Sequence, residues 1–233
     1  INESFKKFTV VDGKIRFGLM AIKNVGDNFI EVIIKAREDG VFTSFTDFCE
    51  RIESIDPSVM NKRAVESLIK CGAMNSLGGN RAQLLAIFEK TMDGIHADRK
   101  RNIDGQFSMF ETIDTKITKD NLPDLKEFPQ KNLLAMEKEM LGIYISGHPL
   151  KPYEEELNKI STITTSELLQ AQEQLEESLN KNIDGAKIVI GGIIVSKKNK
   201  ITKNNNMMAF ITLEDLYGAI ECIVFPATYD RYS

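Results

Sequence analysis

The segment Ile22–Asn28 limits the possible folds of this chain more than any other part of the sequence. Apolar residues recur at helical spacing on both sides of it, namely Ile15, Leu19, Ile22 and Val25 before the turn and Phe29, Ile30, Ile33 and Ile34 after it. Gly40 then supplies a helix stop signal. The sequence therefore predicts two short amphipathic helices joined by a tight turn that contains an apolar residue followed by glycine.

This pattern is typical of a helix-hairpin-helix, which has a simple chemistry. We expect Gly26 to adopt a positive φ and to let a ligand come close to the backbone. The amide N–H groups at the start of the second helix, with the helix dipole behind them, form a concavity suited to a DNA phosphate. The alternative is an ordinary helical hairpin whose glycine serves only packing. The predicted duplex-binding residues are Lys23, Asn24, Val25, Gly26, Asp27, Asn28 and Lys35.

The composition is that of an ordinary soluble protein, and we expect a cytoplasmic location. Hydrophobic residues make up 42% and charged residues 27%, with no apolar run of transmembrane length and no signal peptide. The net charge of −4 excludes a generally basic nucleic-acid binder, so any DNA contact must come from local patches. Cys49, Cys71 and Cys222 favour a reducing compartment and argue against a zinc site. Because the chain opens at Ile1 rather than Met, we expect an excised fragment.

Residues 1–100 are predicted to form one DNA-binding domain. Asp12 and Gly13, between two β-rich runs, predict a hairpin with a type I′ turn. Ser44 and Asn61 are predicted helix N-caps. The helix after Asn61, the glycine turn that ends it and the long helix that follows form a second, degenerate helix-hairpin-helix. The two hairpin units are expected to share one core.

The rest of the chain is predicted in three parts. Residues 101–131 lose helical periodicity and form a surface linker, and residues 132–182 form connecting helices. Residues 183–233 are β-rich, with a glycine-bent first strand at 188–195 followed by a meander, which is how an OB-fold begins. The predicted fold class is α+β: a mainly helical tandem helix-hairpin-helix domain, then helices and a truncated OB-type β-barrel.

The β-rich part contains a predicted single-strand site. Four lysines and no acid occupy the expected loop between the first two strands, and this loop is one of the two that grip oligonucleotides in an OB-fold. Phe210 on the next strand offers a stacking face, worth about 1–3 kcal/mol per base. The alternative is a solvated lysine loop with Phe210 facing the core. The predicted single-strand residues are Lys197, Lys198, Lys200, Lys203 and Phe210.

A further interaction site is predicted inside the linker, where Gln106 stands three residues before the apolar pair Met109 and Phe110. Two adjacent large apolar side chains in a polar segment invite a partner's pocket. In the alternative, Met109 and Phe110 hold the linker on its own domain. No catalytic residue and no metal site are predicted, because the acidic residues show no paired-carboxylate spacing. His148 has no visible nucleophile partner, which favours a structural loop.

Several short motifs follow one another along nearly the whole chain: Ile15–Leu19, Ile22–Gly26, Phe45–Cys49, Asn61–Arg63, Leu68–Ala73, Leu77–Arg81, Glu137–Gly142, Ser146–Leu150 and Ala209–Asp215. In this order they resemble the alpha subunits of bacterial DNA polymerase III, the C-family replicases. Each motif alone is unspecific, but the ordered set is highly specific. The family hairpin usually has glycine at the position of Asn24. Asparagine tolerates the left-handed region better than most residues, so we expect the turn to keep its shape.

The resemblance implies a non-catalytic region of a DNA-directed DNA polymerase, downstream of the palm, whose hairpin pair holds duplex DNA by its backbone. It implies that Gln106, Met109 and Phe110 bind the sliding clamp, and that the OB-type part lies near single-stranded template DNA. The catalytic carboxylates of the parent enzyme, with their magnesium, match nothing here and are expected upstream. The fragment is therefore expected to need no cofactor, and other replicase subunits are further implied partners.

Two other functions compete with this interpretation. Helix-hairpin-helix DNA repair glycosylases place a catalytic Asp some way past the hairpin, and Asp47 lies at roughly that distance. Its neighbours Thr46 and Phe48 do not fit the glycosylase motif. A purely architectural connector is the other alternative. DNA binding separates the connector from the polymerase region, and glycosylase activity separates the repair enzyme from both.

Overall fold

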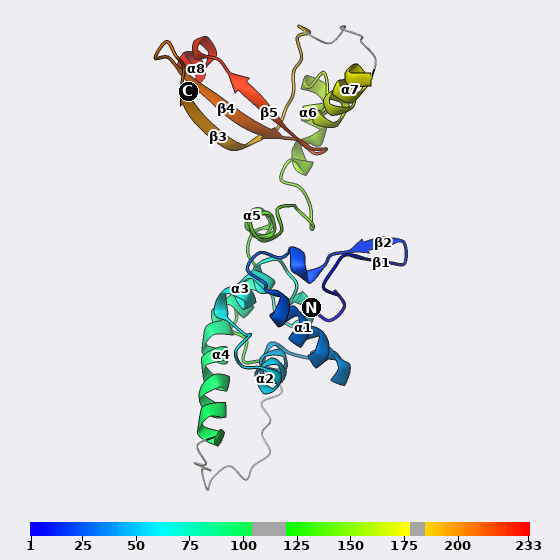
Figure 1. Cartoon of the computed structure of the whole chain (residues 1–233), viewed down its shortest axis with the longest axis vertical. Coiled ribbons are helices and arrows are strands. Elements are labelled where there is room, and N and C mark those ends of the chain that lie inside the picture. Colours follow the sequence, from blue (N-terminus) through cyan, green and yellow to red (C-terminus); the bar gives the residue numbers. More distant parts are fainter. Residues whose placement is uncertain (104–119, 178–184) are drawn as a thin grey trace. The chain divides into compact units, whose positions relative to one another are not determined.

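The structure, a computed structural model, describes residues 1–103, 120–177 and 185–233. It divides into two compact units, Ile1–Ser146 and Gly147–Ser233. The first unit is mainly helical, and the second contains a three-stranded antiparallel sheet (Figure 1). The α+β class is therefore confirmed, whereas the predicted domain boundaries differ from this division.

The described elements of the first unit begin with two short strands and continue with helices (Figure 1). In chain order they are β1 (Thr9–Val11), β2 (Lys14–Arg16), the 3-10 turn η1 (Leu19–Ala21), α1 (Asp27–Ala36), η2 (Arg37–Asp39), α2 (Phe45–Ile55), α3 (Lys62–Lys70), η3 (Asn75–Leu77), α4 (Arg81–Ile103) and α5 (Gln130–Leu141).

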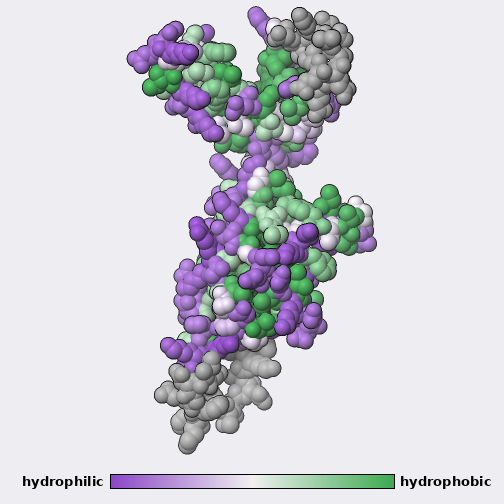
Figure 2. All heavy atoms as spheres, in the orientation of Figure 1, coloured by the Kyte–Doolittle hydropathy of each residue, from purple (hydrophilic) through white to green (hydrophobic). Residues whose placement is uncertain are grey.

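Strands β1 and β2 form a hairpin, which we call the arm. Asp12 and Gly13 have φ values of 51° and 73°, as a type I′ turn requires, so the predicted turn is confirmed. Val10 and Ile15 face each other across the two strands, and 74% and 77% of their surfaces are exposed. Figure 2 shows hydrophobic side chains gathered over the arm.

The prediction of an α-helix before Ile22 is wrong, because the residues that directly precede the Ile22–Gly26 segment form only the short 3-10 helix η1. Ile15 fitted the helical spacing, but the Asp-Gly turn fixes it in β2. Gly18 then lies so close to the start of the chain that a Cβ there would approach the carbonyl carbon of Lys7 to 2.6 Å. The amides of Leu19 and Met20 donate to the carbonyls of Phe5 and Lys6, so this segment is held against the start of the chain.

The core of the first unit lies between α1, α2, α3 and α4. The ring centroids of Phe42 and Phe48 are 5.1 Å apart in an edge-to-face arrangement, and both side chains are buried. The predicted caps are confirmed: Ser44 Oγ accepts from the amide of Asp47, and Asn61 Oδ1 accepts from the amide of Ala64. Local capping and apolar spacing therefore place these helices correctly.

Helix α5 belongs to the first unit, although the sequence predicted it among the connecting helices. It packs on α3. The later part of the predicted linker also lies on this unit: Leu122 packs against its core, and the Asp120 carboxylate accepts from the amides of Phe45 and Thr46 at the start of α2. Residues 120–129 of the predicted surface linker 101–131 are thus held along the surface of the first unit. These contacts are long-range and leave no periodic signal in the sequence.

The second unit holds helices and the sheet. Its described elements are η4 (Lys151–Tyr153), α6 (Glu154–Ile160), α7 (Thr165–Glu177), β3 (Ile193–Ile201), β4 (Met207–Glu214), β5 (Ala219–Val224) and α8 (Pro226–Tyr232). The strand order β3-β4-β5 is the predicted antiparallel meander. The Asp215 carboxylate accepts from the amides of Thr165 and Gly218, so it joins the start of α7 to the β4–β5 turn.

Lys197, Lys198 and Lys200 are part of strand β3, so their assignment to a loop is wrong, whereas Lys203 lies in the turn that follows. Lys198 pairs with Phe210 and Lys200 pairs with Met208 across the two strands. The predicted strand 188–195 was placed too early: β3 begins at Ile193 and continues beyond Val195 through polar residues with weak β-propensity. Pairing with β4 overrides this propensity, and exposed lysines suit an edge strand.

Candidate nucleic-acid interface

The turn between η1 and α1 takes its left-handed residue from Asn24, whose φ is 66°. The expectation that asparagine preserves the turn is confirmed. Gly26 has φ −82° and ψ 159°, so the prediction of a positive φ at this glycine is wrong. The side-chain amide of Asn24 donates to Ser67 Oγ at 3.0 Å and ties the turn to α3. Sequence reasoning missed Ser67, because nothing local links residues so far apart.

The start of α1 presents backbone donors without internal partners. Gly26 caps the helix and supplies no side-chain hydrogen bond. Among the described residues, nothing accepts from the amides of Gly26, Asp27 and Asn28, and all three residues are exposed. A Cβ at Gly26 would meet nothing within 4 Å. These amides and the positive end of the helix dipole are therefore open to an anion.

Other parts of the turn are occupied from within. The amide of Lys23 donates to the carbonyl of Met140 in α5 at 2.9 Å, so only its exposed side chain is available to a ligand. The side chain of Val25 belongs to the core. Lys35 lies at the far end of α1, about 12 Å from Asp27 along the helix axis. The structure therefore does not bring Lys35 together with the turn.

Lys6, which the sequence analysis missed, adds a positive charge beside the start of α1. Asp27 is an acid beside the open amides, and its carboxylate lies 2.5 Å from the Lys6 ammonium. Hydrogen bonds to Asp27 and Glu31 raise the pKa of Lys6. Lys6 offsets the negative charge that Asp27 brings to the anion site. Its backbone carbonyl also accepts from the amide of Met20, which fixes the base of the arm beside the turn.

The predicted single-strand residues are split between the two faces of the sheet. Lys198, Lys200 and Phe210 share one face, because cross-strand partners and alternate residues point the same way. The Lys200 ammonium lies 5.0 Å from the Phe210 ring centroid. Lys197 points to the other face, where its ammonium lies 5.1 Å from the ring of Tyr229 in α8. Lys203 follows β3 in the turn, so it belongs to neither face.

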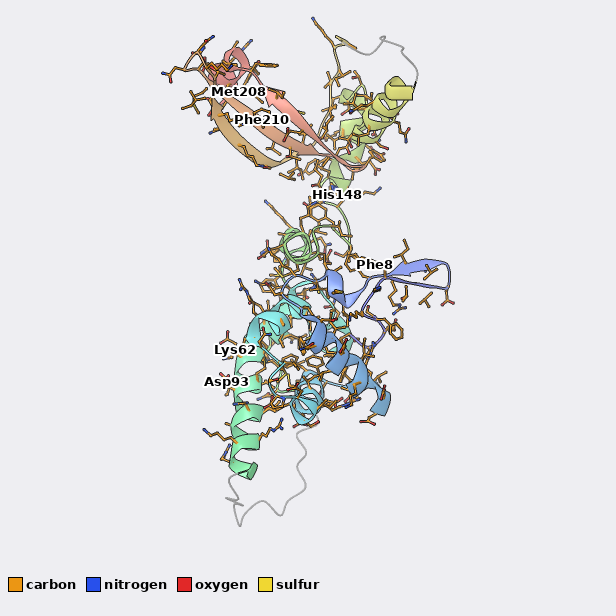
Figure 3. The ribbon with its side chains drawn as sticks, viewed as in Figure 1. Phe8, Lys62, Asp93, His148, Met208 and Phe210 are labelled. Carbon is orange, nitrogen blue, oxygen red and sulfur yellow. The ribbon has the colours of Figure 1, made fainter. Side chains whose placement is uncertain are left out.

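Phe210 is partly exposed, and Met208 is its neighbour on the same strand face (Figure 3). Ile223 of β5 pairs with Phe210 and is 49% exposed. This face therefore combines an aromatic ring, apolar neighbours and two lysines. Such a surface suits stacked bases and a phosphate backbone. The structure thus brings Lys198 and Lys200 together with Phe210, and single-strand binding by these residues stays a prediction.

Other candidate residues have structural surroundings. The Asp47 carboxylate accepts from the amide and hydroxyl of Thr43, so it closes the loop before α2. His148 Nδ1 accepts from the amide of Leu150 at 3.2 Å. Gln106, Met109 and Phe110 lie outside the described residues. Within residues 1–103, 120–177 and 185–233, no three or more His, Cys, Asp or Glu side chains form a group that could hold a metal ion. No helix in the same ranges is long and apolar enough to cross a membrane.

Comparison with known proteins adds two findings. A family model described as a helix-hairpin-helix motif matches residues 1–84. The DNA polymerase III subunit alpha of Saccharopolyspora erythraea is 35% identical over 241 residues, which cover 100% of this chain and 19% of that protein. The same subunit of Borreliella burgdorferi is 37% identical over 237 residues, and that of Bacillus subtilis 36% identical over 234 residues. The chain spans 19% of the length of each of these relatives.

Proposed function

Because the chain belongs to the family of the DNA polymerase III alpha subunits, we propose that it is a DNA-holding region of a replicative DNA polymerase. It binds duplex DNA through a phosphate at the start of α1. The observation that carries this proposal is the set of amides at Gly26, Asp27 and Asn28, which are exposed and have no partner among the described residues. The Lys23 side chain adds a mobile positive charge beside them.

Binding of this kind ignores base sequence. Backbone amides and a lysine contact phosphate oxygens, which fix the position of the duplex and carry no sequence information. Such a grip suits a polymerase, which must hold every sequence that it copies. The affinity falls as salt rises, with a slope of about −0.9 for each phosphate neutralised.

The test is to replace Gly26 with valine. At φ −82° and with open space around the Cβ, valine fits the fold, but its branched side chain covers the neighbouring amides. Gly26→Val should therefore weaken duplex binding and leave the circular dichroism spectrum unchanged. Gly94→Val is the matched control, because Gly94 in α4 is also exposed with nothing within 4 Å of its Cβ. Undiminished binding by Gly26→Val, or a strong base preference, contradicts the proposal.

Clamp binding by Gln106, Met109 and Phe110 is part of the same proposal. Its support is the spacing of these residues and the resemblance to the family. Met109 and Phe110 fill an apolar cleft, where burial of Phe110 contributes on the order of 2 kcal/mol. Calorimetry with the cognate clamp should show binding that Gln106→Ala weakens and a double change of Met109 and Phe110 to Ala abolishes. Intact clamp binding with a lower melting temperature would show that the pair packs on its own domain.

The polymerase reaction is proposed for the whole protein, with its magnesium-binding carboxylates outside this chain. The chain alone should not extend a primer in the presence of template, nucleotides and magnesium, and it should not excise damaged bases. Either activity above a buffer control contradicts this part of the proposal. The glycosylase alternative gains no support from the structure, because the carboxylate of Asp47 accepts hydrogen bonds from the amide and hydroxyl of Thr43.

A further inference from the structure

The first unit has two helical hairpins, one formed by η1 and α1 and the other by α3 and α4. They differ at the position where a helix-hairpin-helix meets phosphate, namely the start of the second helix. In the first hairpin this is the start of α1, where Gly26 offers no side-chain cap. In the second hairpin, formed by α3 and α4, it is the start of α4. There, Asn80 and Gln83 cap each other: Asn80 Oδ1 accepts from the amide of Gln83, and Gln83 Oε1 accepts from the amide of Asn80.

The remaining amides at the start of α4 already hold an anion. The Glu127 carboxylate accepts from the amide of Arg81 at 2.9 Å and from the amide of Ala82 at 3.2 Å. Both bonds come from backbone groups that a phosphate would otherwise use. The start of α4 therefore accepts a negatively charged group in this geometry, and that group comes from the chain itself.

Glu127 is held in this position from both sides. Asn80 donates its side-chain amide to the carbonyl of Leu125 at 2.9 Å, and Gln83 donates to the carbonyl of Pro123 at 2.8 Å. The carboxylate also accepts from the amide of Phe128. The segment before α5 is thus fixed along the first turn of α4. A tethered carboxylate has a high effective concentration, so free phosphate competes poorly with it.

We infer that the Glu127 carboxylate closes the start of α4 to DNA phosphate and so restricts duplex contact to the first hairpin. The inference rests on the proposed duplex binding and names the hairpin that carries it. Like-charge repulsion adds to the blockade, because an approaching phosphate meets the carboxylate before it meets the amides. Glu127 is exposed, so a substitution there uncovers the amides without opening the core.

The test is duplex binding as a function of salt, by fluorescence anisotropy, with the unmodified chain, Glu127→Ala and Asp124→Ala. The control removes the same charge from an exposed neighbour on the same segment. Glu127→Ala should bind more tightly than the control, and the salt slope should steepen by about 0.9, as one further phosphate contact requires. Asp124→Ala should keep the original slope. Equal slopes for the two variants overturn the inference.

A second comparison separates this inference from the proposed function. With Gly26→Val closing the first hairpin, the addition of Glu127→Ala should restore part of the lost duplex binding. If Glu127→Ala is too unstable to measure, Glu127→Gln keeps an oxygen acceptor without the charge and should still bind more tightly than Asp124→Asn. An unmodified chain that binds no duplex defeats the proposed function. Normal binding without any effect at Glu127 defeats only the inference about Glu127.

Discussion

Arg81 and Glu137 form a buried ion pair that joins α4 to α5. Arg81 Nη2 donates to Glu137 Oε1 at 2.8 Å, and only 6% and 1% of the two side chains are exposed. Arg81 also donates to the carbonyl of Lys70 at the end of α3. The other oxygen of Glu137 accepts from the amides of Ile145 and Ser146. One pair of charges thus holds three helices and the last residues of the first unit.

Glu137→Gln should destabilise the first unit strongly. The change keeps the shape of the side chain but leaves the Arg81 charge buried without its counter-ion, which costs about 3–5 kcal/mol. Denaturation in urea measures the loss. The control is Asp93→Asn, which removes the partner of Lys62 in an exposed pair with an Nζ–Oδ2 distance of 2.8 Å (Figure 3). This control should leave the stability unchanged. Equal effects of the two substitutions would contradict the prediction.

The same carboxylate makes the first unit sensitive to acid. Burial would raise the pKa of Glu137, but bonds from the Ser146 amide, Arg81 and the Ile145 amide outweigh burial and lower it. Because the pKa is lower in the folded state, ionised Glu137 stabilises the fold at pH values above the unfolded pKa of about 4.3. This contribution is lost as the pH falls through the pKa of the folded state. The contribution of Glu137 to the free energy of unfolding should therefore be constant from about pH 5 to 7 and fall below about pH 4. Urea denaturation at several pH values should show a shallower acid decline for Glu137→Gln.

The left-handed turn at Asn24 can be separated into backbone and side-chain contributions. Asn24→Ala loses the hydrogen bond to Ser67 and replaces asparagine, which tolerates φ 66°, with alanine, for which the left-handed conformation costs about 1–2 kcal/mol. Asn24→Gly loses the same hydrogen bond, worth about 1 kcal/mol, but glycine accepts the left-handed region without the backbone cost. Asn24→Gly should therefore be more stable than Asn24→Ala. Free energies of unfolding measure the order, and an Asn24→Ala variant as stable as Asn24→Gly would show that the turn relaxes.

The two faces of the sheet should differ in single-strand binding. Changing Lys198 and Lys200 together to Ala should weaken binding of a fluorescent oligonucleotide, because these lysines flank Phe210. Changing Lys197 and Lys203 together removes the same charge from other positions and should have a smaller effect. Equal losses would indicate a general charge effect and contradict a binding face built on Phe210.

Features set by neighbouring residues were predictable from the sequence. The Asp12-Gly13 turn and the caps Ser44 and Asn61 depend on residues a few positions away, so their local chemistry decides the outcome. The order of the helices followed from the same signals. Asn24 belongs to this group, because its tolerance of positive φ is intrinsic to the side chain.

Features set by distant contacts were not predictable. The amide of Lys23 meets the carbonyl of Met140, and the start of α4 meets Glu127, across separations that leave no periodic pattern. Strand β3 includes Lys197, Lys198 and Lys200 because it pairs with β4, and this pairing outweighs their weak β-propensity. The position of the candidate site in the chain therefore follows from a local pattern and stays a prediction, while the surroundings of individual residues within it depend on tertiary contacts.

Gly26 gives the turn an unusual genetic property. Its backbone conformation is open to every L-amino acid, and the space beside it is empty, so the fold does not require glycine there. A screen that ranks variants by solubility or melting temperature would pass nearly any substitution at this position. Damage would become visible only when the protein is asked to hold DNA. Position 26 is therefore a place where a separation-of-function allele can be made at little cost to folding.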